Sequence, residues 1–252
     1  DAADAADMII AQMKAFNIEA ENTTHIIDAI NEVSNNFAVS SADIATNLGK
    51  ASAVMANAGN SFEQMIGLMT AGTEITRNAS KVANGLKTIT LRLQGMNDEG
   101  EKDLQLTAQM EGLFNKLGIS VYNTSGQLKN TYEILGTLAE VYTTLTNAEK
   151  AYVTETIAGK YQAQNAAAIL MNWKTAVDAT STALDSNGSA AAENAKVLEL
   201  DYKKALNYFK ENNITFDIVF LDPPYKDEII EETVTYLLEN NLLNEDAIII
   251  CE

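Results

Sequence analysis

The chain has 252 residues, of which 46% are hydrophobic and 21% charged, a length that allows one or two domains with a sizeable core. Thirteen glycines, two prolines, one cysteine and one histidine exclude collagen-like repeats, an internal disulfide framework and a His-rich metal site. The net charge of −18 argues against unaided binding to nucleic acid or anionic membranes, and no apolar run approaches a membrane span.

The first 200 residues are rich in alanine and contain no proline, a composition that predicts mostly helix. Apolar residues recur there at helical spacing. They predict helices at about 2–16, 24–36, 41–57, 61–71 and 78–94 and, after a polar break, at about 104–117, 130–145, 147–157 and 160–185. A short hairpin is expected between Ile119 and Asn130, around a turn at Ser125–Gly126.

Helix starts are indicated where a short polar residue is followed three positions later by an acid. Ser40, Asn60 and Thr146 have this spacing. A short oxygen side chain can accept from the free N–H groups of a first helical turn, and an acid there suits the helix dipole. These three residues are therefore predicted to be N-caps.

The same 200 residues carry no recognisable catalytic motif. Gly67 and Gly72 have the spacing of a phosphate-binding loop, but Thr73 stands where that loop requires lysine. His25 has no partner at ligand spacing and is expected to be a capping or surface residue, whereas Trp173 is expected in the core. The methionines at positions 55, 65 and 69 predict adaptable core filling, with a partner-binding groove as the alternative.

Ordered sequence blocks in this region resemble the core region of phage tail tape-measure proteins. The blocks are Ala15–Ala20, Ser40–Ala45, Gly59–Glu63 with Ala71–Gly72, and Gly85–Ile89, and the stretch from Gly118 to Ala190 is similar to the segment downstream of that core. The resemblance covers roughly 200 residues. It implies a structural role in tail assembly and length determination, contact with tail tube and tail initiator proteins, and a place in the virion tail or the host cytoplasm. Self-association is expected on a different ground, the unpaired sheet edges of the C-terminal fragment described below. The long helical ruler of that family is absent from this sequence.

The last 52 residues have a different composition, with both prolines and no glycine. A β-rich run, Phe216–Leu221, precedes a predicted helix at about 228–240 and a second apolar run, Ala247–Cys251. This order predicts a βαβ unit. We place the boundary near Leu200, although the sequence from Ala190 to Asn212 predicts one uninterrupted helix.

Between the first strand and the helix lies the motif Asp222–Pro223–Pro224–Tyr225. The Asp222 carboxylate and the Pro223 carbonyl could accept both N–H bonds of an exocyclic amine, and Tyr225 offers a flat face for stacking an extruded base. These three residues are the candidate catalytic residues. The alternative is a simple Pro-Pro turn after a strand.

The stretch from Asp201 to Glu252 resembles small-subunit ribosomal RNA guanine-N2 methyltransferases, which use S-adenosylmethionine. The resemblance implies that Asp222, Pro223 and Tyr225 bind and stack the amine-bearing base. However, the Gly-rich cofactor turn and the acidic ribose-binding residue of that family are missing, and residues 201–252 carry four basic and twelve acidic residues. We therefore expect an inactive fragment that binds no cofactor. The alternative is an S-adenosylmethionine-dependent N-methyltransferase of guanine in ribosomal RNA, completed by another chain in the cytoplasm.

Together these patterns predict a mainly α fold followed by a short α/β, Rossmann-like methyltransferase fragment. The expected segments are a tape-measure core at 1–96, a second helical segment with the hairpin at 97–200, and the partial methyltransferase at 201–252.

Overall fold

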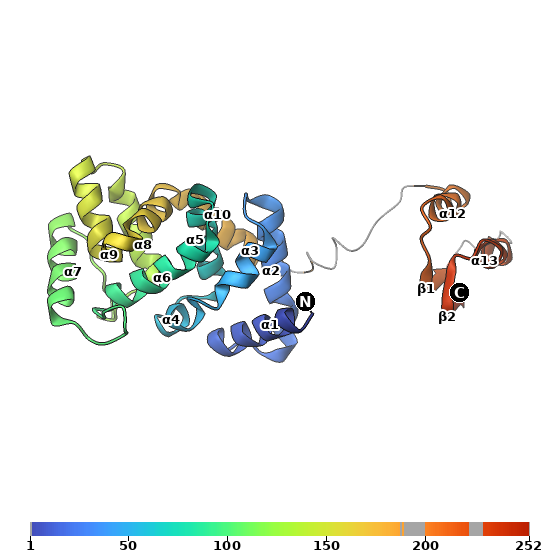
Figure 1. The fold of residues 1–252 in the computed structure, drawn as a ribbon, viewed down its shortest axis with the longest axis horizontal. Helices are drawn as coiled ribbons and strands as arrows, with labels where there is room; N and C mark the ends of the chain where they lie inside the picture. Colours follow the sequence, from blue (N-terminus) through green and yellow to red (C-terminus); the bar gives the residue numbers. More distant parts are fainter. Residues whose placement is uncertain (1, 187, 189–199, 222–228, 252) are drawn as a thin grey trace. The chain divides into compact units, whose positions relative to one another are not determined.

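The computed structural model describes residues 2–186, 188, 200–221 and 229–251 (Figure 1). The chain forms two compact units, Asp1–Asn194 and Ala195–Glu252. The first unit is helical and the second combines helices with a small sheet, which confirms the predicted mainly α fold with a short α/β fragment.

In the first unit, the elements follow the predicted helices closely. They are α1 (Ala2–Phe16), the 3-10 helix η1 (Ala20–Asn22), α2 (Thr23–Asn36), α3 (Ser41–Leu48), α4 (Ser52–Asn57), α5 (Phe62–Thr76), α6 (Ala79–Leu93), α7 (Leu104–Leu117), α8 (Thr131–Tyr142), α9 (Asn147–Met171) and α10 (Trp173–Leu184). An antiparallel bridge between Tyr122 and Leu128 forms the predicted hairpin, with Gly126 at a φ of 78° in its turn.

Helix α5 is the centre of the first unit. It lies beside α6 and α10, with α1–α4 toward one end of the unit and α7–α9 toward the other (Figure 1). Every residue from Met65 to Thr73 is buried, as expected of a helix surrounded by others on all sides. Met55, Met65 and Met69 are all buried in this core, which confirms that the methionines fill it. Both predicted helical segments, 1–96 and 97–200, contribute to the core, and the boundary between them stays a prediction.

The glycines of the rejected phosphate-binding pattern lie where helices cross. A Cβ at Gly67 would collide with the Thr180 side chain and would lie 2.5 Å from the carbonyl oxygen of Ala176 on α10. A Cβ at Gly72 would lie 2.7 Å from Val82 on α6. The spacing of these glycines therefore serves close packing of α5 against its neighbours.

Helix α9 is kinked at Gly159, whose φ of 68° and ψ of 165° are not helical. The kink divides the helix where the sequence predicts two helices. Upstream of it, the Thr156 carbonyl accepts hydrogen bonds from Nε and Nη2 of Arg92, at 3.2 and 3.0 Å. The Arg92 side chain of α6 thus binds a backbone carbonyl of α9 close to the kink at Gly159.

Two predicted helices are interrupted in the structure. The helix expected at 41–57 divides into α3 and α4 around Lys50, and the helix expected at 160–185 breaks at Asn172. The Asn172 amide donates to the Ala71 carbonyl at 3.1 Å and to the Glu74 carboxylate at 3.0 Å. These contacts with α5 fix the second break.

Two of the three predicted N-caps are confirmed. The side chains of Ser40 and Thr146 accept from the backbone N–H groups three residues on. The prediction for Asn60 is wrong, because Ser61 caps α5 and forms a capping box with Gln64. The Asn60 side chain is instead buried, where it accepts from the Tyr132 backbone N–H at 2.9 Å.

His25 and Trp173 each have a structural partner. His25 is half-buried on α2, with Nε2 2.8 Å from Glu63 Oε1, so it links α2 to the start of α5 rather than lying free on the surface. Trp173 packs against the core as predicted, and its ring lies 4.9 Å from that of Tyr132.

The second unit consists of α12 (Tyr202–Glu211), β1 (Phe216–Leu221), α13 (Ile229–Glu239) and β2 (Leu243–Cys251). The two strands are parallel and form a two-stranded sheet, which confirms the predicted βαβ order. The prediction of an uninterrupted helix from Ala190 to Asn212 is wrong at Leu200 and Asp201, which are not helical. Asp201 is an N-cap in extended conformation, and its carboxylate accepts from the Lys204 backbone N–H at 3.1 Å.

Candidate functional site

The predicted catalytic residues Asp222, Pro223 and Tyr225 lie outside the described residues, so their roles stay predictions. The elements that flank them are described. Leu221, the last residue of β1, pairs in register with Cys251, the last residue of β2. Both parallel strands thus end at one edge of the sheet, the edge beyond which ligands bind in open α/β folds.

One face of this sheet is covered and the other is bare. Val219 and Ile249 pair in register and are half-buried, on the face toward the helices. On the opposite face Ile218 is 64% exposed and its register partner Ile248 is 57% exposed, and Phe220 is exposed beside them. Strands that are apolar on both faces are typical of parallel sheets covered on both sides. The described unit covers only one side.

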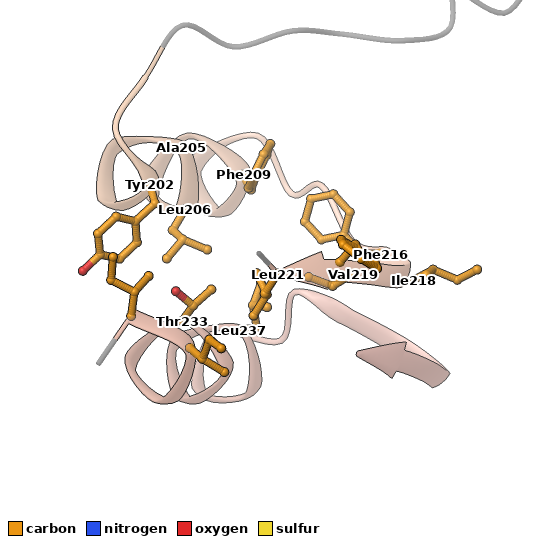
Figure 2. A pocket seen from close by; sticks show the side chains of 13 residues that line it. Tyr202, Ala205, Leu206, Phe209, Phe216, Ile218, Val219, Leu221, Thr233 and Leu237 are labelled. Atoms are coloured by element: carbon orange, nitrogen blue, oxygen red, sulfur yellow. The ribbon is translucent and has the colours of Figure 1, made fainter. Parts of the chain in front are cut away.

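A cavity of about 410 Å³ lies between α12, β1 and α13 (Figure 2). Leu206 of α12 and Thr233 and Leu237 of α13 point into it. The residues that line it are Tyr202, Ala205, Leu206, Phe209, Phe216, Ile218, Val219, Phe220, Leu221, Ile229, Ile230, Thr233 and Leu237. The lining is almost entirely apolar. Thr233 is the exception: it is 4% exposed, and its hydroxyl has no hydrogen-bond partner among the described residues.

Polar contacts close one side of this region by linking α12 to α13. The Tyr202 hydroxyl donates to Glu232 Oε2 at 2.8 Å, and Lys203 Nζ lies 2.7 Å from Glu232 Oε1. These hydrogen bonds, from Lys203 and then Tyr202, lower the pKa of Glu232, while the bond to Glu232 raises the pKa of Tyr202. A carboxylate held ionised in this way suits an ion pair better than a general base.

No group of three or more His, Cys, Asp or Glu among the described residues could hold a metal ion. Residues 201–252 contain no glycine. No helix within the described ranges is long and apolar enough to cross a membrane.

The helical part matches a known family over most of its length. Residues 1–159 match the family model of the phage-related minor tail protein. The chain belongs to this minor tail protein family. The match confirms the resemblance to phage tail proteins that the sequence blocks indicate.

The rest of this minor tail protein resembles a second family. Residues 162–252 match the model of conserved hypothetical protein 95. Two curated relatives are ribosomal RNA small subunit methyltransferases D: the protein of Buchnera aphidicola subsp. Baizongia pistaciae is 38% identical over 47 residues, 19% of this chain and 24% of its own length. That of Haemophilus influenzae is 36% identical over 64 residues, 25% of this chain and 32% of its own length. The chain thus spans 24% and 32% of the length of these two relatives, and no solved structure matches it.

The family boundary and the structural boundary of the tail protein do not coincide. The second match begins at residue 162, within α9, whereas the second compact unit begins at Ala195. Helices α9 and α10 pack on α5 and α6, and Ile169, Leu170 and Ala176 belong to the core of the first unit. By their packing, α9 and α10 therefore belong to the helical unit, although the second family match includes part of α9 and all of α10.

Proposed function

We propose that the helical unit is a folded structural segment of a tape-measure protein, acting in phage tail assembly. The observation that supports this most is the family match over residues 1–159 on a unit with one continuous helical core and no metal-binding cluster among the described residues. Its partners are the tail tube and tail initiator proteins, in the virion tail or in the host cytoplasm during assembly.

In this proposal the helical unit takes part in tail assembly but does not by itself set the length of the tail. The longest helix in the described residues, α9, has 25 residues and is kinked. At about 1.5 Å per residue it would span roughly 40 Å even if it were straight. The segment therefore contributes a compact domain that contacts other tail proteins, and the extended ruler lies elsewhere.

A binding experiment tests the structural role. The full chain, immobilised, should retain the tail tube or tail initiator protein encoded in the same genome. The control is Ile66→Asp, which places a charge in the fully buried centre of α5 and should unfold the unit. Failure of the folded chain to retain either protein would contradict the proposal.

We propose that the second unit, in this chain alone, methylates nothing. Its two-stranded sheet, its lack of glycine and its coverage of at most 32% of the methyltransferase relatives support this. The second candidate is an S-adenosylmethionine-dependent methyltransferase of a guanine amine in ribosomal RNA, in which another chain supplies the cofactor half. Asp222, Pro223 and Tyr225 would then hold and stack the base.

Calorimetry with S-adenosylmethionine separates these two candidates. The chain alone should show no saturable binding, and radiolabelled donor should leave deproteinised small-subunit RNA unlabelled. The same assay is repeated with an added polypeptide that carries the first half of the Haemophilus influenzae relative. Labelling that appears only in this mixture, and that Asp222→Ala removes, would establish the second candidate.

A further inference from the structure

Among the residues that the structure describes, the outer edge of β1 is open. In the described residues β1 pairs with β2 on one side and with no strand on the other. An unpaired edge presents backbone N–H and C=O groups that can pair with another strand. A two-stranded sheet is also marginally stable on its own. The edge of β1 can therefore form backbone hydrogen bonds with a further strand, and such a strand would stabilise the sheet.

The cavity shows where that strand would lie. Successive residues of a strand point to opposite faces of a sheet. Val219 on the covered face and Ile218 on the bare face both line the cavity, whereas no described residue of β2 does. The cavity therefore lies against β1, the strand with the open edge, and not against β2. The free hydroxyl of Thr233 adds an unmet hydrogen bond inside the same space.

An extended polypeptide can pair with the edge of β1 and enter this cavity at the same time. A strand lying in the plane of the sheet sends alternate side chains to both faces, so it would fill the space beneath α12 and extend the bare face at once. The neighbouring stretch of this chain lacks the required pattern. Residues 222–228 contain two prolines and four charged residues, and Tyr225 is their one large apolar side chain.

Charge indicates the chemistry of the partner. Residues 201–252 carry a net charge of −8, which favours a segment with basic residues and repels a second copy of the same unit. We propose that the outer edge of β1 binds an extended strand of another protein, with alternating apolar and β-branched side chains flanked by lysine or arginine.

The structure offers a matched pair of variants for the test. Ile218 and Ile248 are register partners on the bare face, with similar exposure of 64% and 57%, but only Ile218 lines the cavity. Ile218→Lys and Ile248→Lys add the same charge to the same face at similar cost to folding. Only the first places a charge next to the proposed strand, because Ile248 lies on the far strand.

The probe is the fluorescein-labelled, amidated peptide KKVIVTVKK, titrated by anisotropy into the full chain at physiological salt. We expect saturable binding to a monomer, weakened roughly tenfold or more by Ile218→Lys and less than about twofold by Ile248→Lys. A control peptide, KKVIPTVKK, carries a central proline and should bind at least roughly tenfold more weakly. Circular dichroism verifies that both variants remain folded.

Each other outcome would overturn the proposal. Equal weakening by both variants would indicate a partner that covers the bare face, and weakening by Ile248→Lys alone would place the docking on β2. Binding of the proline peptide as tight as that of the first would show charge attraction without strand pairing. Sedimentation that gives a dimer of the chain before peptide is added would assign the edge to a second copy.

Discussion

Glu74 shows how one acidic side chain holds several elements of the helical unit together. From α5, its carboxylate accepts from the Ala38 backbone N–H at 3.1 Å, from the Asn172 amide at 3.0 Å and from the Thr175 hydroxyl at 3.1 Å. Burial by itself would raise the pKa of Glu74, but these hydrogen bonds outweigh it and hold the pKa below the ordinary 4.5. Glu74 therefore connects α5 to the segment between α2 and α3 and to α10.

This shift fixes the sign of a pH dependence. Because the folded-state pKa of Glu74 is lower than the unfolded one, the carboxylate stabilises the fold above the unfolded pKa, and this contribution is lost as pH falls through the folded pKa. Glu74→Gln should lower the free energy of unfolding by about 1–2 kcal/mol at pH 7, and the difference should shrink below pH ~4. Urea denaturation of both proteins at several pH values measures it.

The matched control is Glu99→Gln, a change in an exposed loop residue. It should alter the free energy of unfolding by less than about 0.5 kcal/mol at pH 7. A difference between wild type and Glu74→Gln that is the same at pH 7 and pH 3 would show that the charge of Glu74 is not what stabilises the unit.

At the scale of elements, the crossing of α5 and α10 depends on a missing side chain. Gly67→Ala should destabilise the unit by about 1–3 kcal/mol, because the added methyl group meets Thr180 and the backbone of Ala176, although alanine favours helix. Gly112→Ala on α7 is the control: it is exposed with open space around it, and it should stabilise by about 0.5–1 kcal/mol. Thermal unfolding of both variants would show the opposite signs, and equal signs would refute the packing argument.

The sequence predicts most helices to within a few residues, because periodicity and caps are local signals. It misses the features that distant contacts decide. Asn60 has the spacing of an N-cap, but its side chain binds the backbone of Tyr132, 72 positions away in the sequence, and Ser61 becomes the cap instead. Asn172 likewise interrupts a predicted helix through contacts with α5. No local pattern contains these partners.

The candidate site was predictable in part. The order of strand, motif, helix and strand could be found in the sequence, since β-rich runs and Pro-Pro pairs are local. The cavity could not be found, because it depends on how Leu206 of α12, Thr233 of α13 and strand β1 are brought together in the folded unit. No local sequence pattern predicts such a cavity, because the residues that line it are far apart in the sequence.

At the scale of the whole molecule, the two units differ in the size of their cores. The core of the first unit draws on helices throughout its length, whereas among the described residues of the second unit the buried apolar ones are Leu206, Leu237 and Leu242. Local opening free energy follows buried apolar contact. Amide hydrogens of β1 and α13 should therefore exchange at least roughly a hundredfold faster than those of α5 and α6.

Hydrogen exchange followed by mass spectrometry measures this difference, with peptides from both units compared in one sample. Helix α7 serves as an internal reference for exchange rates. One face of it packs in the large core, while its other face is exposed to solvent. Protection of β1 equal to that of α5 would contradict the view that the second unit is a marginal fragment.

Cys251 is exposed at the end of β2 and is the sole thiol in the chain. Its position gives the molecule a built-in attachment point: one maleimide dye per chain would sit beside Leu221, immediately before the proline motif. Emission from such a dye would report on that end of the sheet without any engineered cysteine, and the helical unit would contribute no competing label.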